Sequence, residues 1–230
     1  MTIICKAYLF EPSNFATAVA PYVTAIKEDR KRGYGLLCAA VIDLFEHNPN
    51  VERISLNYGA YDIEGVREAV AEDNSSQSYI GWMLSFLLYG QFHHAKPYNI
   101  GGTNSTRLLR QYLLTIGWDE RDTLLLVEGR SFVEFSQMYI YSSTEVVDIP
   151  DYWKHVYPTS TGASEGWLSP SDVERLAARL VEDEKKLPPA KRFGIPNFGM
   201  KSILEDYQST KLAYLAAREA GCGLCIICSG

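Results

Sequence analysis

The stretch GWLSPSDVERLAARL, residues 166–180, carries the strongest structural signal in the sequence. Ser169 is an expected helix N-cap, Pro170 fits the first helical position because no amide donor is needed there, and Asp172 lies near the positive end of the helix dipole. Apolar residues then recur at helical spacing, at Val173, Leu176, Ala177, Leu180 and Val181. The pattern predicts an amphipathic helix with one buried face.

The C-terminal stretch LAYLAAREAGCGLCIICSG predicts a helix followed by a strand. The helix is expected from about Ser202 to Glu219, and Gly221 follows where a left-handed C-terminal cap is common. The segment GLCIIC then has the length and apolar character of a buried strand. At the other end of the sequence, residues 2–10 are rich in β-formers and precede a helical pattern, so they predict a first strand.

These elements predict an α+β fold, with one globular domain over residues 1–230. A small mixed sheet is expected to include the N- and C-terminal strands, which are candidates for neighbours, and to pack against several helices. Alternating apolar residues from Ile54 to Tyr58 predict a further strand. The segment FHHAKPYNIGGTNST is interpreted as a loop, with Ser105 or Thr106 capping the helix after it.

The composition excludes several classes of protein. The net charge of −6 argues against general nucleic-acid binding, which requires a basic surface. The longest apolar run, YIGWMLSFLLYG, is shorter than the ~20 residues that cross a bilayer, so no membrane association is expected. With no secretory signal visible, five cysteines indicate free thiols in a reducing compartment, and a cytoplasmic location is predicted.

Cys222, Cys225 and Cys228 pose a choice between a metal site and a buried strand. In a strand, Cys222 and Cys228 share one face while Cys225 takes the other, so three ligands do not converge on one ion. A structural zinc site or iron–sulfur cluster also needs a fourth ligand, which the sequence does not supply locally. We therefore interpret the segment as a core strand and expect neither a metal nor a cofactor.

A candidate anion-binding site is indicated by PYNIGGTNSTRLLR, residues 97–110. Two glycines and small polar residues lead into a helix start, where backbone N–H groups favour a negative ligand. The N–H groups of Thr106 and Arg107 are the expected contacts, with charge from Arg110. The match to a phosphate-binding loop is weak, because the P-loop lysine is absent. A simple capped helix start is the competing interpretation of the same residues.

Two adjacent histidines, His93 and His94, lie just before this stretch, beside Lys96. An imidazole with an ordinary pKa near 6.5 can act as a general acid or base at neutral pH. No motif places a carboxylate or nucleophile beside them, so a solvated loop is the competing interpretation. The catalytic residues therefore stay unknown.

The motifs GWDERDTLLLVEGRSF, EGWLSPSDVERLAARL and LAYLAAREAGCGLCII resemble uncharacterised bacterial proteins of the YfbM-like kind. The resemblance covers mainly the C-terminal half. It implies a fold in which a Leu-Ser-Pro cap opens a late helix and the chain closes with a helix and a strand. It implies no catalytic residues.

Two functions are compatible with the sequence. The first is a non-enzymatic binding protein, such as a bacterial immunity or inhibitor protein that masks a protein partner. Its basis is fifteen tyrosines and a net negative charge, because tyrosine is favoured at interfaces and acidic surfaces steer basic partners. The alternative is an enzyme or a nucleotide- or phosphate-binding protein with its site at residues 93–110.

Overall fold

A computed structural model describes residues 4–47, 64, 67–68, 77–91, 96–130, 165–187 and 198–229. Backbone contacts divide the chain into two compact units. Unit 1 comprises residues 1–10, 96–130 and 157–230, and unit 2 comprises residues 11–95 and 131–156. A single domain over residues 1–230 was expected from the sequence. The division into two compact units does not test that expectation, which stays a prediction.

Unit 1 is built on a four-stranded sheet with the order β2-β1-β4-β3. The strands are β1 (Ile4–Phe10), β2 (Tyr98–Gly102), β3 (Glu165–Leu168) and β4 (Gly223–Ser229). Neighbouring strands are all antiparallel, and β1 pairs with β4 from Ile4 opposite Ser229 to Phe10 opposite Gly223. The α+β class and the pairing of the terminal strands are therefore confirmed. The four described strands are antiparallel where a mixed sheet was expected, because a strand's direction is set by its partner and not by its own side-chain pattern.

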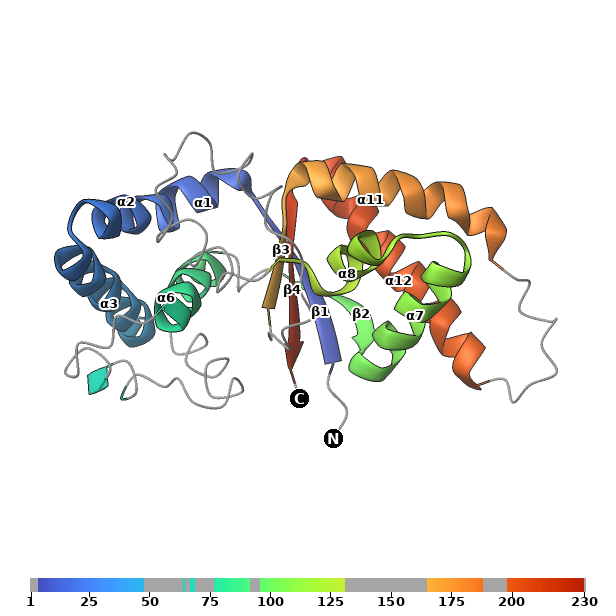
Figure 1. Cartoon of the computed structure of the whole chain (residues 1–230), viewed down its shortest axis with the longest axis horizontal. Helices are drawn as coiled ribbons and strands as arrows, with labels where there is room; N and C mark the ends of the chain where they lie inside the picture. Colours follow the sequence, from blue (N-terminus) through green and yellow to red (C-terminus); the bar gives the residue numbers. More distant parts are fainter. Residues whose placement is uncertain are drawn as a thin grey trace. The chain divides into compact units, whose positions relative to one another are not determined.

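Four helices of unit 1 gather on one side of this sheet (Figure 1). They are α7 (Thr103–Thr115), α8 (Glu120–Glu128), α11 (Pro170–Asp183) and α12 (Phe198–Ala220), and the 3-10 turn η1 (Glu184–Lys186) follows α11. The core beneath them contains Ala7 and Ile226 from the sheet, Leu126 from α8, Leu176 from α11 and Tyr214 from α12. Burial of these apolar faces is the main source of the unit's stability.

The cap predicted for α11 is confirmed. The Ser169 side chain accepts a hydrogen bond from the backbone N–H of Asp172, while an Asp172 carboxylate oxygen accepts from the Ser169 backbone N–H. The left-handed cap predicted at Gly221 is also confirmed, since this residue follows α12 with φ +66°. Asp119 caps α8 and Gly129 ends it in the same local way. These local signals act within one or two turns, which is why the sequence alone locates them.

The core-strand interpretation of the cysteine triplet is confirmed for the described residues. Cys225 is fully buried in β4, and Leu224 and Ile226 on either side of it join the helix-covered core. Cys222 precedes the strand and is partly exposed. No three potential metal ligands converge among the residues that the structure places.

The segment interpreted as a loop contains β2, and this expectation is corrected. Tyr98–Gly102 pairs with β1, with a bulge between Cys5 and Lys6. Glycine and asparagine disfavour a strand locally, but pairing with β1 supplies hydrogen bonds that the sequence pattern does not reveal. The strand predicted at Ile54–Tyr58 lies outside the described residues.

Unit 2 contains four described helices: α1 (Pro12–Ala18), α2 (Ala20–Glu28), α3 (Arg30–His47) and α6 (Gln77–Gly90). Gly33 allows α2 and α3 to approach closely, since a Cβ at that position would lie 2.3 Å from the Ile26 backbone nitrogen. The rings of Phe45 and Phe86 join α3 to α6 at 4.7 Å between centroids. No described helix has the length and apolarity needed to span a membrane.

A buried ion pair connects α11 to the end of α8. Arg130, which is 2% exposed, donates to both carboxylate oxygens of Asp172, at 2.5 and 3.0 Å. The Arg130 backbone also forms an antiparallel bridge with Trp167 of β3. One residue thus ties together the end of α8, the edge strand and the start of α11.

We expect Arg130→Met to lower the free energy of unfolding by about 3–5 kcal/mol, because Asp172 would remain as a buried charge without its partner. Arg67→Met is a suitable control, since Arg67 forms an exposed pair with Glu64 that is worth about 0–1 kcal/mol. Urea unfolding followed by tryptophan fluorescence measures both values. Equal losses in the two variants would contradict the structural role of the buried pair.

Candidate functional site

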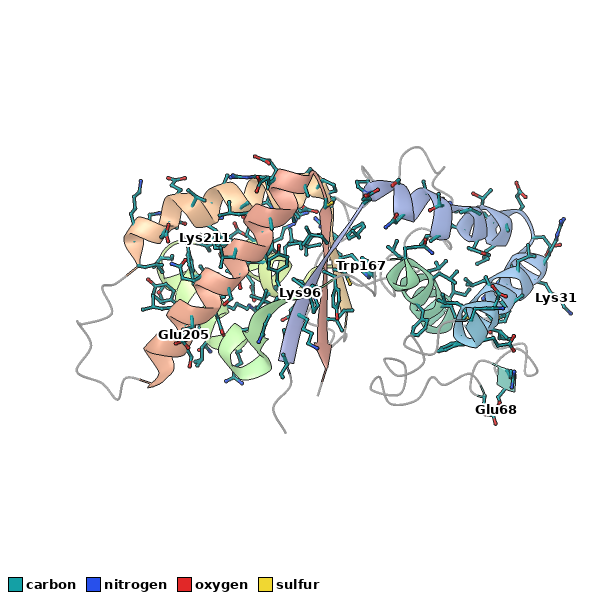
Figure 2. The ribbon with its side chains drawn as sticks, turned by 180° about the vertical axis from the view of Figure 1, so that it is seen from behind. Lys31, Glu68, Lys96, Trp167, Glu205 and Lys211 are labelled. Carbon is teal, nitrogen blue, oxygen red and sulfur yellow. The ribbon has the colours of Figure 1, made fainter. Side chains whose placement is uncertain are left out.

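The structure places the described residues of the predicted anion site in different surroundings. Lys96 is exposed ahead of β2 (Figure 2), and Arg107 is exposed on α7. Thr106 is 8% exposed and faces the interior. Arg110 donates to Glu120 at 2.9 Å, so its charge is already paired. His93 and His94 lie outside the described residues.

The helix after the two glycines begins earlier than predicted. Because α7 starts at Thr103, Ser105 and Thr106 lie within the helix and do not cap it. The N–H groups without an intrahelical partner belong to the first residues of a helix, here residues 103–105, and not to Thr106 or Arg107. The sequence missed this start because Thr, Asn and Ser all suit several positions around a helix N-terminus.

A carboxylate of the chain itself lies against the glycine pair. A Cβ placed at Gly101 would be 2.6 Å from Oδ2 of Asp206, a buried residue of α12. Gly101 also has φ +121°, a conformation that side-chain-bearing residues rarely adopt. The space over Gly101 is thus occupied from within the protein. An external anion at the same place would have to displace the Asp206 carboxyl group.

A second place in unit 1 has the character of a recognition site. A groove of about 440 Å³ runs along α11 and the start of α8. Its charged lining comprises Asp122, Arg175, Arg179, Glu182, Asp183 and Lys186. The apolar face of α11 is fixed against the core by residues such as Leu176 and Leu180, so the charged face necessarily points outward.

Asp122 anchors two arginines in this groove. The carboxylate accepts from Nη1 of Arg175 at 2.5 Å and from Nη1 of Arg179 at 2.8 Å. Nη2 of Arg179 donates to the Gly117 carbonyl at 2.9 Å, and its guanidinium carbon lies 4.3 Å from the centroid of the Trp118 ring. Arg179 is therefore fixed by contacts on several sides. Among the described residues Arg175 pairs with Asp122, and its side chain is 49% exposed.

Asp183 is the second carboxylate that holds side chains in this groove. Its carboxylate accepts from Nε1 of the Trp118 indole at 2.7 Å and from Nζ of Lys186 at 2.5 Å. The Asp183 side chain is almost fully buried, whereas that of Lys186 is about half exposed. A buried carboxylate with a charged and a neutral donor is stable as an anion. The ammonium group of Lys186 is consequently held at the groove's surface.

Two carboxylates of this region have lowered pKa values. Burial raises the pKa of Asp119, but hydrogen bonds from the Asp122 backbone and from Arg179 outweigh burial and leave it below its usual range. For Asp183, burial likewise acts to raise the pKa, and donors on Lys186 and Trp118 reverse the effect. Both groups are therefore ionised at neutral pH.

The groove has side chains with fixed charges that can recognise charges on a binding partner. Its lining carries three cationic and three anionic side chains, so its net charge is zero. A free phosphate or a metal ion would favour an excess of one sign, whereas a protein surface with charges of both signs fits a lining of mixed charge. The sequence contained a signal for this face, since Arg175 and Arg179 lie four residues apart on one side of the predicted helix. Nothing in the sequence indicated that these two arginines contact α8.

Comparison of the chain with protein-family models, curated proteins and solved structures gives no match. The resemblance to YfbM-like proteins therefore stays a prediction from the sequence.

We expect Gly101→Ala to destabilise unit 1 more than Gly117→Ala does. Both glycines have positive φ, at +121° and +95°, but nothing lies within 4 Å of a Cβ at Gly117. The control carries only backbone strain, of order 1–3 kcal/mol, while Gly101→Ala also displaces Asp206. Thermal unfolding of both variants gives the comparison. Equal losses would show that Asp206 does not occupy the space over Gly101.

We expect Asp183→Asn to lower the free energy of unfolding by about 1–3 kcal/mol at pH 7. Because the folded-state pKa of Asp183 is lowered, its contribution is present above the unfolded-state pKa and is lost as pH falls through the folded-state value. The difference from the wild type should therefore shrink below about pH 4. Urea unfolding at a series of pH values measures it.

Glu182→Gln is the matched control, because Glu182 is the neighbouring residue on the exposed side of α11. Its effect at pH 7 should stay within about 0.5 kcal/mol. A pH-independent loss in Asp183→Asn would mean that the ionised carboxylate is not the stabilising species.

Proposed function

We propose that this chain is a non-enzymatic binding protein and that the groove along α11 contacts its protein partner. A bacterial immunity or inhibitor protein, which masks the surface of another protein, is the form of this function that the sequence favours. The observation that carries the proposal is Arg175, a half-exposed arginine that lines the charged groove and pairs with Asp122.

The fixed geometry of the groove supports binding. Arg179 is already immobilised by Asp122, Gly117 and Trp118, so little side-chain entropy is lost when a partner contacts this surface. Arginine is also enriched at protein interfaces because its planar guanidinium makes several directional hydrogen bonds. The Arg175 guanidinium has more N–H donors than its contact with Asp122 uses. We expect the remaining donors to bind a carboxylate or a carbonyl oxygen of the partner.

The protonation states in the groove favour binding over acid–base catalysis. A general acid or base works best with a pKa near the operating pH. The pKa values of Asp119 and Asp183 lie below the ordinary aspartate range, so both carboxylates stay ionised at neutral pH. The arginines are permanently charged. These groups therefore exchange no proton during binding at neutral pH.

The interface role expected for tyrosine stays a prediction. Among the described tyrosines, Tyr8, Tyr34, Tyr207 and Tyr214 are buried. Tyr207 and Tyr214 donate to the carbonyls of Leu180 and Leu126, respectively, and so contribute to the core. The arginine-bearing groove is therefore a second basis for an interface, beside the tyrosines. The net charge of −6 still favours encounter with a basic partner.

The location in the cell is part of the proposal, and we place the protein in the cytoplasm of a bacterium. The alternative, an enzyme or phosphate-binding protein with a site at residues 93–110, stays a prediction from the sequence. The carboxylate of Asp206 beside Gly101 weighs against it.

We expect Arg175→Ala to reduce recovery of the partner at least about tenfold when immobilised protein captures it from native cells. Arg107→Ala is the matched control, because it removes an exposed arginine from another helix of the same unit. Proteins that bind charged surfaces unspecifically should be recovered equally by both variants. Melting curves establish that each variant is folded.

Two results would contradict the proposal. One is equal recovery of every captured protein by the wild type and Arg175→Ala. The other is loss of the partner with Arg107→Ala and not with Arg175→Ala, which would move the binding surface to α7 and support the alternative.

A further inference from the structure

The outward face of α11 and of the turn η1 after it carries charges that the described chain does not pair. Glu174, Glu182 and Lys185 are exposed and form no ion pair with any described residue. Arg175 is half exposed, and its guanidinium has donors that Asp122 does not use. In Figures 1 and 2, α11 runs along one border of unit 1. We propose that this face binds a second copy of the same chain, with the two α11 helices antiparallel about a twofold axis.

The spacing of two opposite charges makes the face complementary to itself. Arg175 and Glu182 are seven residues apart, which places them on nearly the same side of α11 and about 10 Å apart along its axis. In an antiparallel pair of helices, Arg175 of one protomer meets Glu182 of its partner. A twofold axis repeats the same contact at the other end of the pair. Parallel helices in the same register would instead set Arg175 against Arg175.

A second pair of charges fits the same register. Glu174 and Lys185 are also of opposite sign, and the midpoint between them lies about one residue, or 1.5 Å, from the midpoint of Arg175 and Glu182. A flexible lysine side chain covers this difference. The register that joins Arg175 to Glu182 therefore also brings Glu174 near Lys185, again twice by symmetry. Agreement of two independent pairs on one register is the main support for a second copy as the occupant.

The centre of the face allows two helices to approach closely. Ala178 lies midway between Arg175 and Glu182, is exposed, and has a small side chain, so the backbones of two α11 helices meet there without obstruction. Val181, which is 47% exposed, lies at the edge of the same face and loses contact with water in the pair. Since each protomer contributes little more than one helix, the contact area is small and the dimer is weak.

Self-association would regulate the groove, because a second copy covers the same side of α11 that the proposed protein partner contacts. Dimer and partner complex would therefore exclude each other. The inference does not rest on the proposed function, since it concerns the purified chain alone. Failure to dimerise would leave partner binding untouched, and failure to capture a partner would leave the dimer untouched.

Sedimentation velocity of the full-length chain at about 10 µM to 1 mM measures the association. Salt at about 0.15 M screens the repulsion between two net charges of −6. We expect the wild type to form dimers as its concentration rises. Arg175→Glu and Glu182→Arg each set like charges against each other at both ends, so each variant should associate at least about tenfold more weakly. An equimolar mixture of the two variants restores opposite charges at both ends and should associate like the wild type.

Arg107→Glu and Glu219→Arg are the matched controls, because they make the same charge changes at exposed positions of α7 and α12. Both should associate like the wild type, and melting curves establish that every variant is folded. A wild type that stays monomeric at 1 mM would overturn the proposal. A mixture that associates no more strongly than its separate components would overturn it too.

A second pair of variants keeps the test decisive if Arg175→Glu is unstable without its contact to Asp122. Glu174→Lys and Lys185→Glu change exposed residues that have no ion pair to lose within the described chain. Each should weaken association alone, and the equimolar mixture should recover it. Wild-type association in both separate variants would contradict the register.

Discussion

The buried ion pair between Arg130 and Asp172 is the interaction on which the described architecture of unit 1 depends most. A guanidinium removed from water is stable only with a partner of excellent geometry, and Asp172 supplies two acceptor oxygens. The same carboxylate closes the capping box of α11 with Ser169. Arg130 meanwhile bridges to Trp167 through its backbone. Charge pairing, helix capping and strand pairing therefore converge on two residues, and each constrains the geometry of the others.

This constraint also positions the groove. With its first turn held by Arg130 and its apolar face against the core, α11 has no freedom to rotate about its axis. Arg175 and Arg179 are then presented toward the start of α8, where Asp122 lies in the first turn. Lys211 of α12, labelled in Figure 2, binds Glu184 just beyond the end of α11. The groove is rigid because both ends of its main helix are fixed.

The candidate sites illustrate how far sequence patterns reach. The glycine pair before α7 was expected to lie beside an external anion, but the carboxyl group of Asp206, about a hundred residues away in the chain, lies over Gly101. The groove was missed for a related reason. Its cations were visible as an exposed helical face, whereas Asp122 and Trp118, which fix them, come from another helix. In both cases the sequence contained one side of a long-range contact and gave no sign of the other.

The sequence by itself determined the features that depend on short-range interactions. The cap at Ser169, the helix ends at Gly129 and Gly221, and the apolar strand at the C-terminus follow from hydrogen bonds and periodicity within a few residues. Tertiary structure decided the antiparallel direction of the strands, the conversion of Tyr98–Gly102 into an edge strand, and the charge partners of the groove. These depend on contacts between distant segments, whose free energy outweighs the weak local preferences of the residues involved.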